Sequence, residues 1–296
     1  MKNLYPFLNP VQWVKARRFA RQNAKFDKSS NDLELLLYSR ISNNNMLHYG
    51  YFEDTETRPE TISLEQFESA QMNYSEKIIE HIIDKDSLVL DVGCGMGGFS
   101  NLLISNGYFV ESLTPNINQI TFIKRTYPHI TTHNCKYEAL ETSKKYGTVV
   151  NSESLQYISL DEAIAKTNEV ITPGGRWVII DYFSLEKKGN HQKPHHLSTF
   201  LDKTKASGWN LVYERNVTPN ILPTLKYAQM CVDRFFMPIK QFTFEKLKIK
   251  KPKLFFLSER LRASIDQKIE KETKTINPEV FLKDRKYVLL VLEKTH

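Results

Sequence analysis

Short apolar runs alternate with helical patterns along most of the chain. The run at 88–90 is followed by a glycine-rich turn and a helical pattern that begins at Phe99. Further apolar runs predict six more strands, at 108–113, 130–135, 146–150, 176–183, 209–217 and 285–294. Because strands that alternate with helices form parallel sheets covered on both faces, the pattern predicts an α/β fold. We expect the sixth and seventh strands to pair with each other.

Polar residues mark where several helices begin. Ser63 and Gln66 have the spacing of a capping box, and so do Ser159 and Glu162. Asn-Pro at 9–10 predicts a helix start as well. The helix after it mixes apolar residues with arginines, so it can cover a site, touch a membrane surface or pack on the core. We expect packing on the core. A second helical segment is expected at 32–41.

About 65 residues separate the sixth and seventh predicted strands, far more than a hairpin turn needs. This insertion contains aromatic and methionine-rich helical sequence and then a basic stretch with four phenylalanines. We expect it to form a helical cap with an apolar acceptor pocket. The predicted division is a helical lid region at 1–83, a core at 84–218 and 285–296, and the inserted cap at 219–284.

Candidate chemistry begins at the first glycine-rich turn. Asp91 follows the first apolar run, and glycines stand at 93, 95, 97 and 98. Glycines allow a ligand to approach the backbone, and the helix start offers free N–H groups. Another nucleotide site and a purely structural turn remain alternatives, because short glycine motifs have many false matches.

The run DVGCGMGG, an acid two residues before the first of alternating glycines, resembles motif I of the class I S-adenosylmethionine (SAM) methyltransferases. The resemblance covers roughly residues 45–215 and the last strand. It implies a Rossmann-like seven-stranded, mostly parallel sheet with helices on both faces, and SAM as cofactor. The segment around Tyr51 and Gln71 resembles the lid of the small-molecule, cyclopropane-fatty-acid-synthase-like branch.

The resemblance implies a set of cofactor-binding residues at the carboxyl ends of the strands. Thr114 stands where most of these enzymes carry an acid for the ribose, and Lys136 stands where an acid often flanks the adenine. The expected contacts are Tyr51, Gln71, Asp91, Gly93, Cys94, Gly95, Thr114, Gln119, Cys135, Lys136, Tyr137 and Asn151.

The expected catalytic residues lie in three loops. Tyr49 and Glu153 are electron-rich neighbours for a sulfonium, and His48 or a histidine of 191–196 is a candidate base. The catalytic set is His48, Tyr49, Glu153, His191 and His195. The histidines lack an accompanying carboxylate or cysteine, so we expect no metal site.

Composition narrows the function further. The 296 residues are 41% hydrophobic and 25% charged, without an apolar run of membrane-span length or a signal peptide at the start, so we expect a cytoplasmic protein. Three isolated cysteines fit a reducing compartment. The net charge of +7 is concentrated at 11–28 and 239–253, each +5. Such flanks suit weak contact with an anionic surface, or solvation alone.

We therefore expect methylation of a small, apolar or lipid-like acceptor at oxygen, nitrogen or carbon. Cyclopropane-synthase-like lipid modification is one alternative. An RNA methyltransferase that uses the basic flanks is another, although the loop after the fourth strand lacks the Pro-Pro-Tyr pattern of nucleic-acid enzymes, which makes nucleic acid a poor partner. A SAM-binding protein without turnover is the third. The oligomeric state is not predicted.

Overall fold

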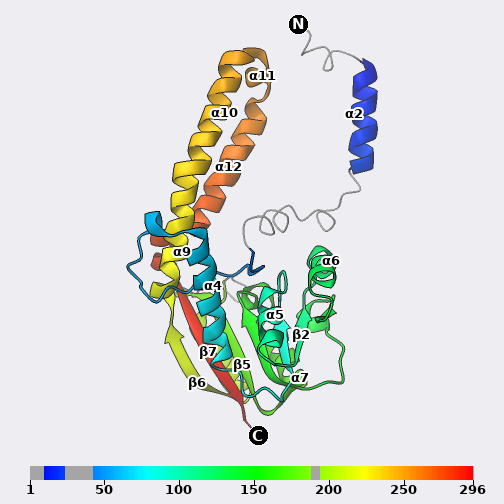
Figure 1. The fold of residues 1–296 in the computed structure, drawn as a ribbon, viewed down its shortest axis with the longest axis vertical. Helices are drawn as coiled ribbons and strands as arrows, with labels where there is room; N and C mark the ends of the chain where they lie inside the picture. The colour runs from blue at the N-terminus through cyan, green and yellow to red at the C-terminus, as the bar shows by residue number, and fades with distance from the viewer. Residues whose placement is uncertain (1–9, 24–42, 188–193, 296) are drawn as a thin grey trace.

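The computed structural model describes residues 10–23, 43–187 and 194–295. Its seven strands form one sheet in the order β3-β2-β1-β4-β5-β7-β6 (Figure 1), in which β7 is antiparallel to both neighbours and the other pairs are parallel. The predicted α/β sheet is confirmed. The strands are β1 (Val89–Val92), β2 (Val110–Leu113), β3 (Thr131–His133), β4 (Tyr146–Ser152), β5 (Ile171–Ser184), β6 (Trp209–Asn216) and β7 (Arg285–Lys294).

Helices cover both faces of this sheet. On one face, α7 (Leu160–Val170) and α8 (Leu197–Ala206) bury apolar side chains against Trp177 and its neighbours. On the other, α4 (Leu64–Ile79) and α5 (Gly98–Ser105) pack on β1, β4 and β5. The remaining helix of the core, α6 (Ile117–Thr126), packs beside α5 through Ile123 and Ile104.

The two predicted capping boxes have different outcomes. At the start of α4, the Ser63 hydroxyl accepts a hydrogen bond from the Gln66 N–H, and the Gln66 side chain accepts one from the Ser63 N–H. At the start of α7, Ser159 makes no side-chain capping bond. The helix there begins as expected, but its first turn is not held by the box.

The insertion between β6 and β7 is helical, as expected. It contains α9 (Thr218–Cys231), a π-helical turn (Val232–Phe236), α10 (Met237–Lys250), α11 (Pro252–Leu257), α12 (Glu259–Ile276) and α13 (Pro278–Asp284). In Figure 1, α10 and α12 run side by side and project away from the sheet, with α11 at the far end. An ion pair between Lys240 and Asp266, 2.8 Å apart, joins the two long helices.

This hairpin is not the apolar cap that the sequence led us to expect. No residue of α10 or α11 is buried. Phe242 and Phe256 are exposed, and no residue of the hairpin lines the two cavities described below. Only the base of the insertion joins the core, through Ile221 and Leu225 of α9 and Phe281 of α13.

The hairpin leaves and rejoins the sheet at one edge. β6 is parallel to β5, so Asn216 ends at the carboxyl edge of the parallel strands, and the β7 residue Arg285 pairs there with Ser184 at the end of β5. By the topology of open α/β sheets, this edge carries the ligand site.

Residues Pro10–Asn23 form the helix α2, and Asn9, the predicted N-cap, lies outside the described residues. Its side chains at 10–19 are exposed, so the expected packing of this helix on the core is wrong for the residues described. The helical segment predicted at 32–41 lies outside the described residues. None of the described helices combines the length and the apolar character needed to cross a membrane.

Candidate functional site

The turn after β1 is shaped by glycines that no other residue fits. Gly93 has φ +80°, and a Cβ there would lie 2.4 Å from the Cβ of Ser154 in the loop after β4. At Gly98, the first residue of α5, a Cβ would lie 2.4 Å from the carbonyl oxygen of Asn44. The glycines therefore bring three chain segments together at the carboxyl edge of β1 and β4.

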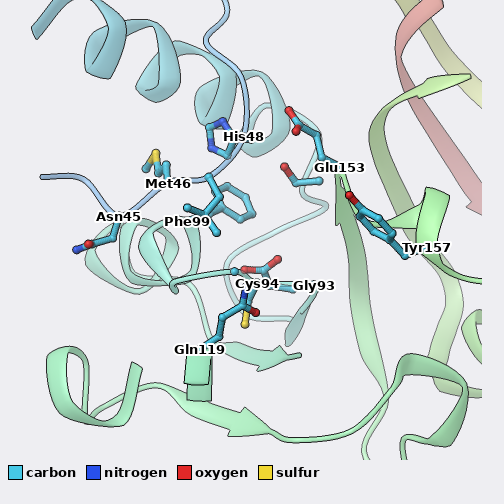
Figure 2. Close-up of a pocket in the computed structure, with 13 residues that line it drawn as sticks. Asn45, Met46, His48, Gly93, Cys94, Phe99, Gln119, Glu153 and Tyr157 are labelled. Atoms are coloured by element: carbon cyan, nitrogen blue, oxygen red, sulfur yellow. The ribbon is translucent and has the colours of Figure 1, made fainter. Parts of the chain in front are cut away.

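Two adjoining cavities open at this edge, with volumes of about 360 and 330 Å³. Gly93, Gln119, Glu153 and Tyr157 line both of them. Figure 2 shows the first cavity and labels these residues of its lining: Asn45, Met46, His48, Gly93, Cys94, Phe99, Gln119, Glu153 and Tyr157. A single elongated ligand can extend from one cavity into the other.

Asp91 is the buried acid of the first cavity. Its carboxylate accepts a 2.5 Å hydrogen bond from the Ser100 hydroxyl, which in turn accepts one from Ser112. Burial raises the pKa of Asp91 to about 6, against the effect of the Ser100 bond. A cationic ligand group beside it would favour the charged form. The neighbouring Cys94 thiol is buried, which raises its pKa well above the usual value, so it is no nucleophile.

Glu153 stands between the two cavities in an unusual backbone conformation. Its φ is +51°, a left-handed value that non-glycine residues rarely adopt outside functional sites. Its Oε1 accepts hydrogen bonds from the Tyr49 N–H, at 2.8 Å, and from the Tyr287 hydroxyl, at 2.5 Å. Burial raises the pKa of Glu153 to about 7. The carboxyl group is thus held in place and changes its charge near neutral pH.

The segment 43–48 covers the first cavity, and Gln71 of α4 holds it there. The Gln71 amide donates to the carbonyl oxygens of Met46, at 3.0 Å, and His48, at 2.7 Å. Its own oxygen accepts from the Asn44 side chain at 3.0 Å. Gln71 lines neither cavity. It acts on the site through the covering segment and is not the direct cofactor contact that we expected.

His48 lines the first cavity, but both of its ring nitrogens are hydrogen-bonded to other protein atoms. Nδ1 donates to the Tyr49 carbonyl at 2.8 Å, and Nε2 lies 3.2 Å from the Ser75 hydroxyl. The ring stacks on Tyr74 with centroids 4.1 Å apart, and burial lowers its pKa to about 4. His48 is therefore neutral at pH 7 and forms part of the wall, which disagrees with its expected role as a base.

The second cavity has polar groups on one wall. The Thr114 hydroxyl donates to the Gln119 side-chain oxygen at 2.6 Å, and the Asn116 side chain caps α6. Lys136 is exposed and lies 3.7 Å from Glu138. The apolar part of the wall comes from Leu113, Pro115, Tyr137 and Ile158. The predicted positions Thr114, Gln119, Lys136 and Tyr137 therefore meet in one cavity.

Four other predicted residues point elsewhere. The Tyr51 ring is buried between the cations of Lys77 and Arg215. The Asn151 amide donates to Ser154 and accepts from Trp177, both at 2.8 Å, so it positions the loop after β4. Cys135 packs against the core, and His195 Nε2 lies against the carbonyls of Leu155 and Ile158.

These four residues line neither cavity, so their expected direct roles are corrected. Tyr49 acts through its backbone N–H on Glu153 and also lines neither cavity. His191 lies outside the described residues. Among the residues that are described, no group of three or more potential ligands could hold a metal ion.

Several residues of the site escaped the sequence reasoning. The covering residues carry no motif, and only their place before a lid-like aromatic cluster pointed to them. Asn116 had a signal, because Asn is one of the residues preferred at the start of a helix. The additional lining residues are Asn45, Met46, Leu47, Val92, Phe99, Leu113, Pro115, Asn116, Glu138, Ser152, Ser154, Tyr157 and Ile158.

Comparison with known proteins places the site in context. Residues 89–175 match the family model described as a methyltransferase domain. No curated protein matches the sequence as a whole or in part. Among solved structures, the chain is similar to the cyclopropane synthase MmaA2 from Mycobacterium tuberculosis, with a TM-score of 0.62 and 14% identity over 87% of this chain and 93% of that chain.

Two further structures are similar to the same extent. Geranyl diphosphate C-methyltransferase from Streptomyces coelicolor, with Mg²⁺, geranyl diphosphate and S-adenosyl-L-homocysteine bound, has a TM-score of 0.61 and 15% identity, covering 87% of this chain and 92% of that chain. The cyclase SpnF has a TM-score of 0.61 and 16% identity, covering 88% and 91%. At such identities the likeness establishes the fold, and the family match confirms the resemblance seen in the glycine turn.

Proposed function

We propose that the chain, whose residues 89–175 match a methyltransferase domain, transfers a methyl group from SAM to a small, apolar or lipid-like acceptor, at oxygen, nitrogen or carbon. The observation that carries this proposal is the pair of adjoining cavities at the edge of β1, β2 and β4, which share Gly93, Gln119, Glu153 and Tyr157. SAM is an elongated molecule with a charged amino-acid end and a nucleoside end. The first cavity contains the buried carboxylate of Asp91, and the second combines polar side chains with an apolar wall.

The residues of the first cavity suit the amino-acid end. Asp91 offers a buried carboxylate for an ammonium group, and Gly93 and Gly95 leave room for the chain beside it. The residues of the second cavity suit the nucleoside. Thr114 and Gln119 can bond ribose hydroxyls in place of the more usual acid, and the apolar wall offers a surface for a purine.

When bound, SAM supplies an electrophilic methyl group on a cationic sulfur. Glu153, which lines both cavities, would place a carboxylate near that charge and stabilise it. An acceptor O–H or N–H must also lose a proton, and a carboxyl group with a pKa of about 7 is suited to take it at neutral pH. The covering segment 43–48 keeps water from the reacting atoms.

The acceptor class rests on two observations. Tyr157 is 70% exposed at the mouth shared by both cavities, where an apolar acceptor can lie against its ring. Similar folds include an enzyme with geranyl diphosphate bound and a cyclopropane synthase. Methyl transfer to an apolar compound fits both, and a cyclopropane-forming variant of the chemistry would use the same cavities.

The test is calorimetric titration with S-adenosylhomocysteine, with NAD and ATP as controls. We expect S-adenosylhomocysteine to bind, and we expect no binding of NAD or ATP. Asp91→Asn should weaken it by roughly 10- to 100-fold, because a charge-assisted hydrogen bond is lost. The matched control Asp202→Asn, at an exposed position on α8, should leave affinity unchanged. The proposal is refuted if the folded wild-type protein does not bind S-adenosylhomocysteine. It is also refuted if Asp91→Asn and Asp202→Asn change the affinity equally.

A further inference from the structure

The far end of the hairpin combines positive charge with exposed apolar side chains. We define the hairpin tip as residues 246–262, from the last turns of α10 through α11 to the start of α12. The tip holds seven lysines and arginines and a single glutamate, a net charge of +6. The whole chain carries +7, and these 17 residues lie in one of its two strongly basic regions, the other being 11–28.

The apolar residues of the tip face outward. Ile249 and Leu257 are each 77% exposed, and Phe256 is 74% exposed. Their neighbour Phe255 is held differently, because the Arg262 guanidinium lies 3.5 Å from its ring centroid and donates to its carbonyl oxygen at 3.0 Å. Arg262 thus fixes α11 against α12, and Phe256 and Leu257 remain on the outside of a fixed turn.

The position of the tip relates it to the site. Both ends of the insertion join the sheet at the carboxyl edge, which also carries the two cavities. Figure 1 shows α10 and α12 extending from that end of the molecule to α11. A surface contacted by the tip therefore lies on the side of the molecule where ligands enter.

We propose that the hairpin tip docks on the surface of an anionic lipid bilayer, with Ile249, Phe256 and Leu257 entering the headgroup region and the lysines around them binding lipid phosphates. Lysines and exposed aliphatic and aromatic side chains at one end of a helical element are the combination that anionic interfaces bind. This inference goes beyond methyl transfer. It can be tested by measuring membrane binding, whether or not the protein has methyltransferase activity.

Three kinds of partner could contact this surface: a second copy of the chain, a nucleic acid or a bilayer. The charge and the exposed apolar residues of the tip distinguish between them. A second copy of the tip would bring +6 against +6, which opposes self-association. A nucleic acid would pair with the lysines, but it would leave three large apolar side chains in water. A bilayer accounts for both sets of residues.

The experiment is co-sedimentation of the full-length protein with vesicles. One set of vesicles is phosphatidylcholine alone, and the other is an equal mixture of phosphatidylcholine and phosphatidylglycerol. We expect strong binding to the mixed vesicles only. Lys250→Gln, Lys251→Gln and Lys253→Gln together should weaken it roughly 100-fold, since each lysine near an anionic surface contributes about 1 kcal/mol, or about fivefold in affinity. The triple variant Ile249→Ser, Phe256→Ser and Leu257→Ser should weaken it at least about tenfold.

The matched control removes three exposed lysines from the body of the protein. Lys124→Gln, Lys187→Gln and Lys205→Gln lower the net charge by the same amount and should leave vesicle binding within about twofold of wild type. All exchanged residues are exposed, so the variants should fold, which circular dichroism verifies. Equal loss in both lysine variants would overturn the proposal in favour of overall charge.

Two other results would also overturn it. Unchanged binding by the serine variant, together with tip-dependent binding of an RNA homopolymer, would identify a nucleic-acid surface. A wild-type dimer in sedimentation velocity that the serine variant abolishes, without vesicle binding, would identify a contact between copies. Because S-adenosylhomocysteine titration is independent of these measurements, failure of the docking proposal and failure of the methyltransferase proposal are distinguishable.

Discussion

The sheet and the hairpin use apolar residues in opposite ways. Trp177, Phe200 and Trp209 pack together under the sheet, almost without exposed surface. Phe242, Ile249 and Phe256 of the hairpin keep most of their surface exposed. Burial within the chain explains the first group, because it stabilises the fold. The second group contributes little to the fold, so its explanation lies in contacts outside the chain.

The largest effect we predict tests this contrast in stability. Trp177→Ala should lower the free energy of unfolding by about 3–5 kcal/mol, because it removes a fully buried ring and leaves a cavity. Phe242→Ala should change it by no more than about 0.5 kcal/mol, as expected for an exposed position. Urea denaturation measures both. If the Phe242 variant loses as much stability as the Trp177 variant, the hairpin is part of the cooperative core and the contrast is wrong.

A smaller effect sharpens the description of the site within the core. The pKa of about 7 leaves Glu153 protonated at low pH and charged at high pH. Only the charged form attracts a sulfonium, so the affinity for SAM should rise several-fold as the pH increases through 7. S-adenosylhomocysteine has a neutral sulfur but the same ammonium group, so it corrects for titration of Asp91.

Calorimetry from pH 6 to 8 makes this comparison directly. The ratio of the SAM affinity to the S-adenosylhomocysteine affinity should increase with pH in the wild type and stay flat in Glu153→Gln. If this ratio does not change with pH in the wild type, Glu153 does not lie near the sulfur.

The smallest effect concerns the outer surface of the hairpin. Lys274 and Glu270 form an exposed ion pair on α12, 2.9 Å apart and four residues apart in sequence. Lys274→Gln should lower the free energy of unfolding by no more than about 0.5 kcal/mol, since such pairs are screened by water and salt. Thermal unfolding at low and high salt measures this. A loss above about 1 kcal/mol would show that the hairpin relies on its surface charges for its structure.

The strands and the glycine turn were predictable because their signals are local. An apolar run such as 88–90 identifies a buried strand, and the alternating glycines after Asp91 specify a turn whose φ values only glycine adopts easily. The same local argument found the capping box at Ser63, although the same spacing at Ser159 gives no capping bond. The match to a methyltransferase domain, at residues 89–175, covers the glycine turn and the strands β1 to β4.

Side-chain direction was not predictable, because it depends on distant partners. Gln71 was expected to touch the cofactor, but two carbonyls of the covering segment occupy its amide. His195 was expected to act as a base, but it lies against the carbonyls that follow β4. The aromatic residues of the insertion fit a buried cap and an exposed hairpin equally well, since spacing fixes which residues share a helix face and not what that face meets.

The length of α12 has a consequence for access to a bilayer. Its 18 residues correspond to about 27 Å, close to the full thickness of a hydrocarbon core. A tip embedded in the headgroups with the hairpin upright would hold the cavities that far above the membrane, and an acceptor would have to leave the lipid phase completely. If the hairpin instead tilts toward the membrane plane, the cavities would lie at the level of the headgroups. Exposed Phe235 of the π-helical turn and exposed Ile239 and Phe242 of α10 continue the apolar surface and would favour that tilted orientation.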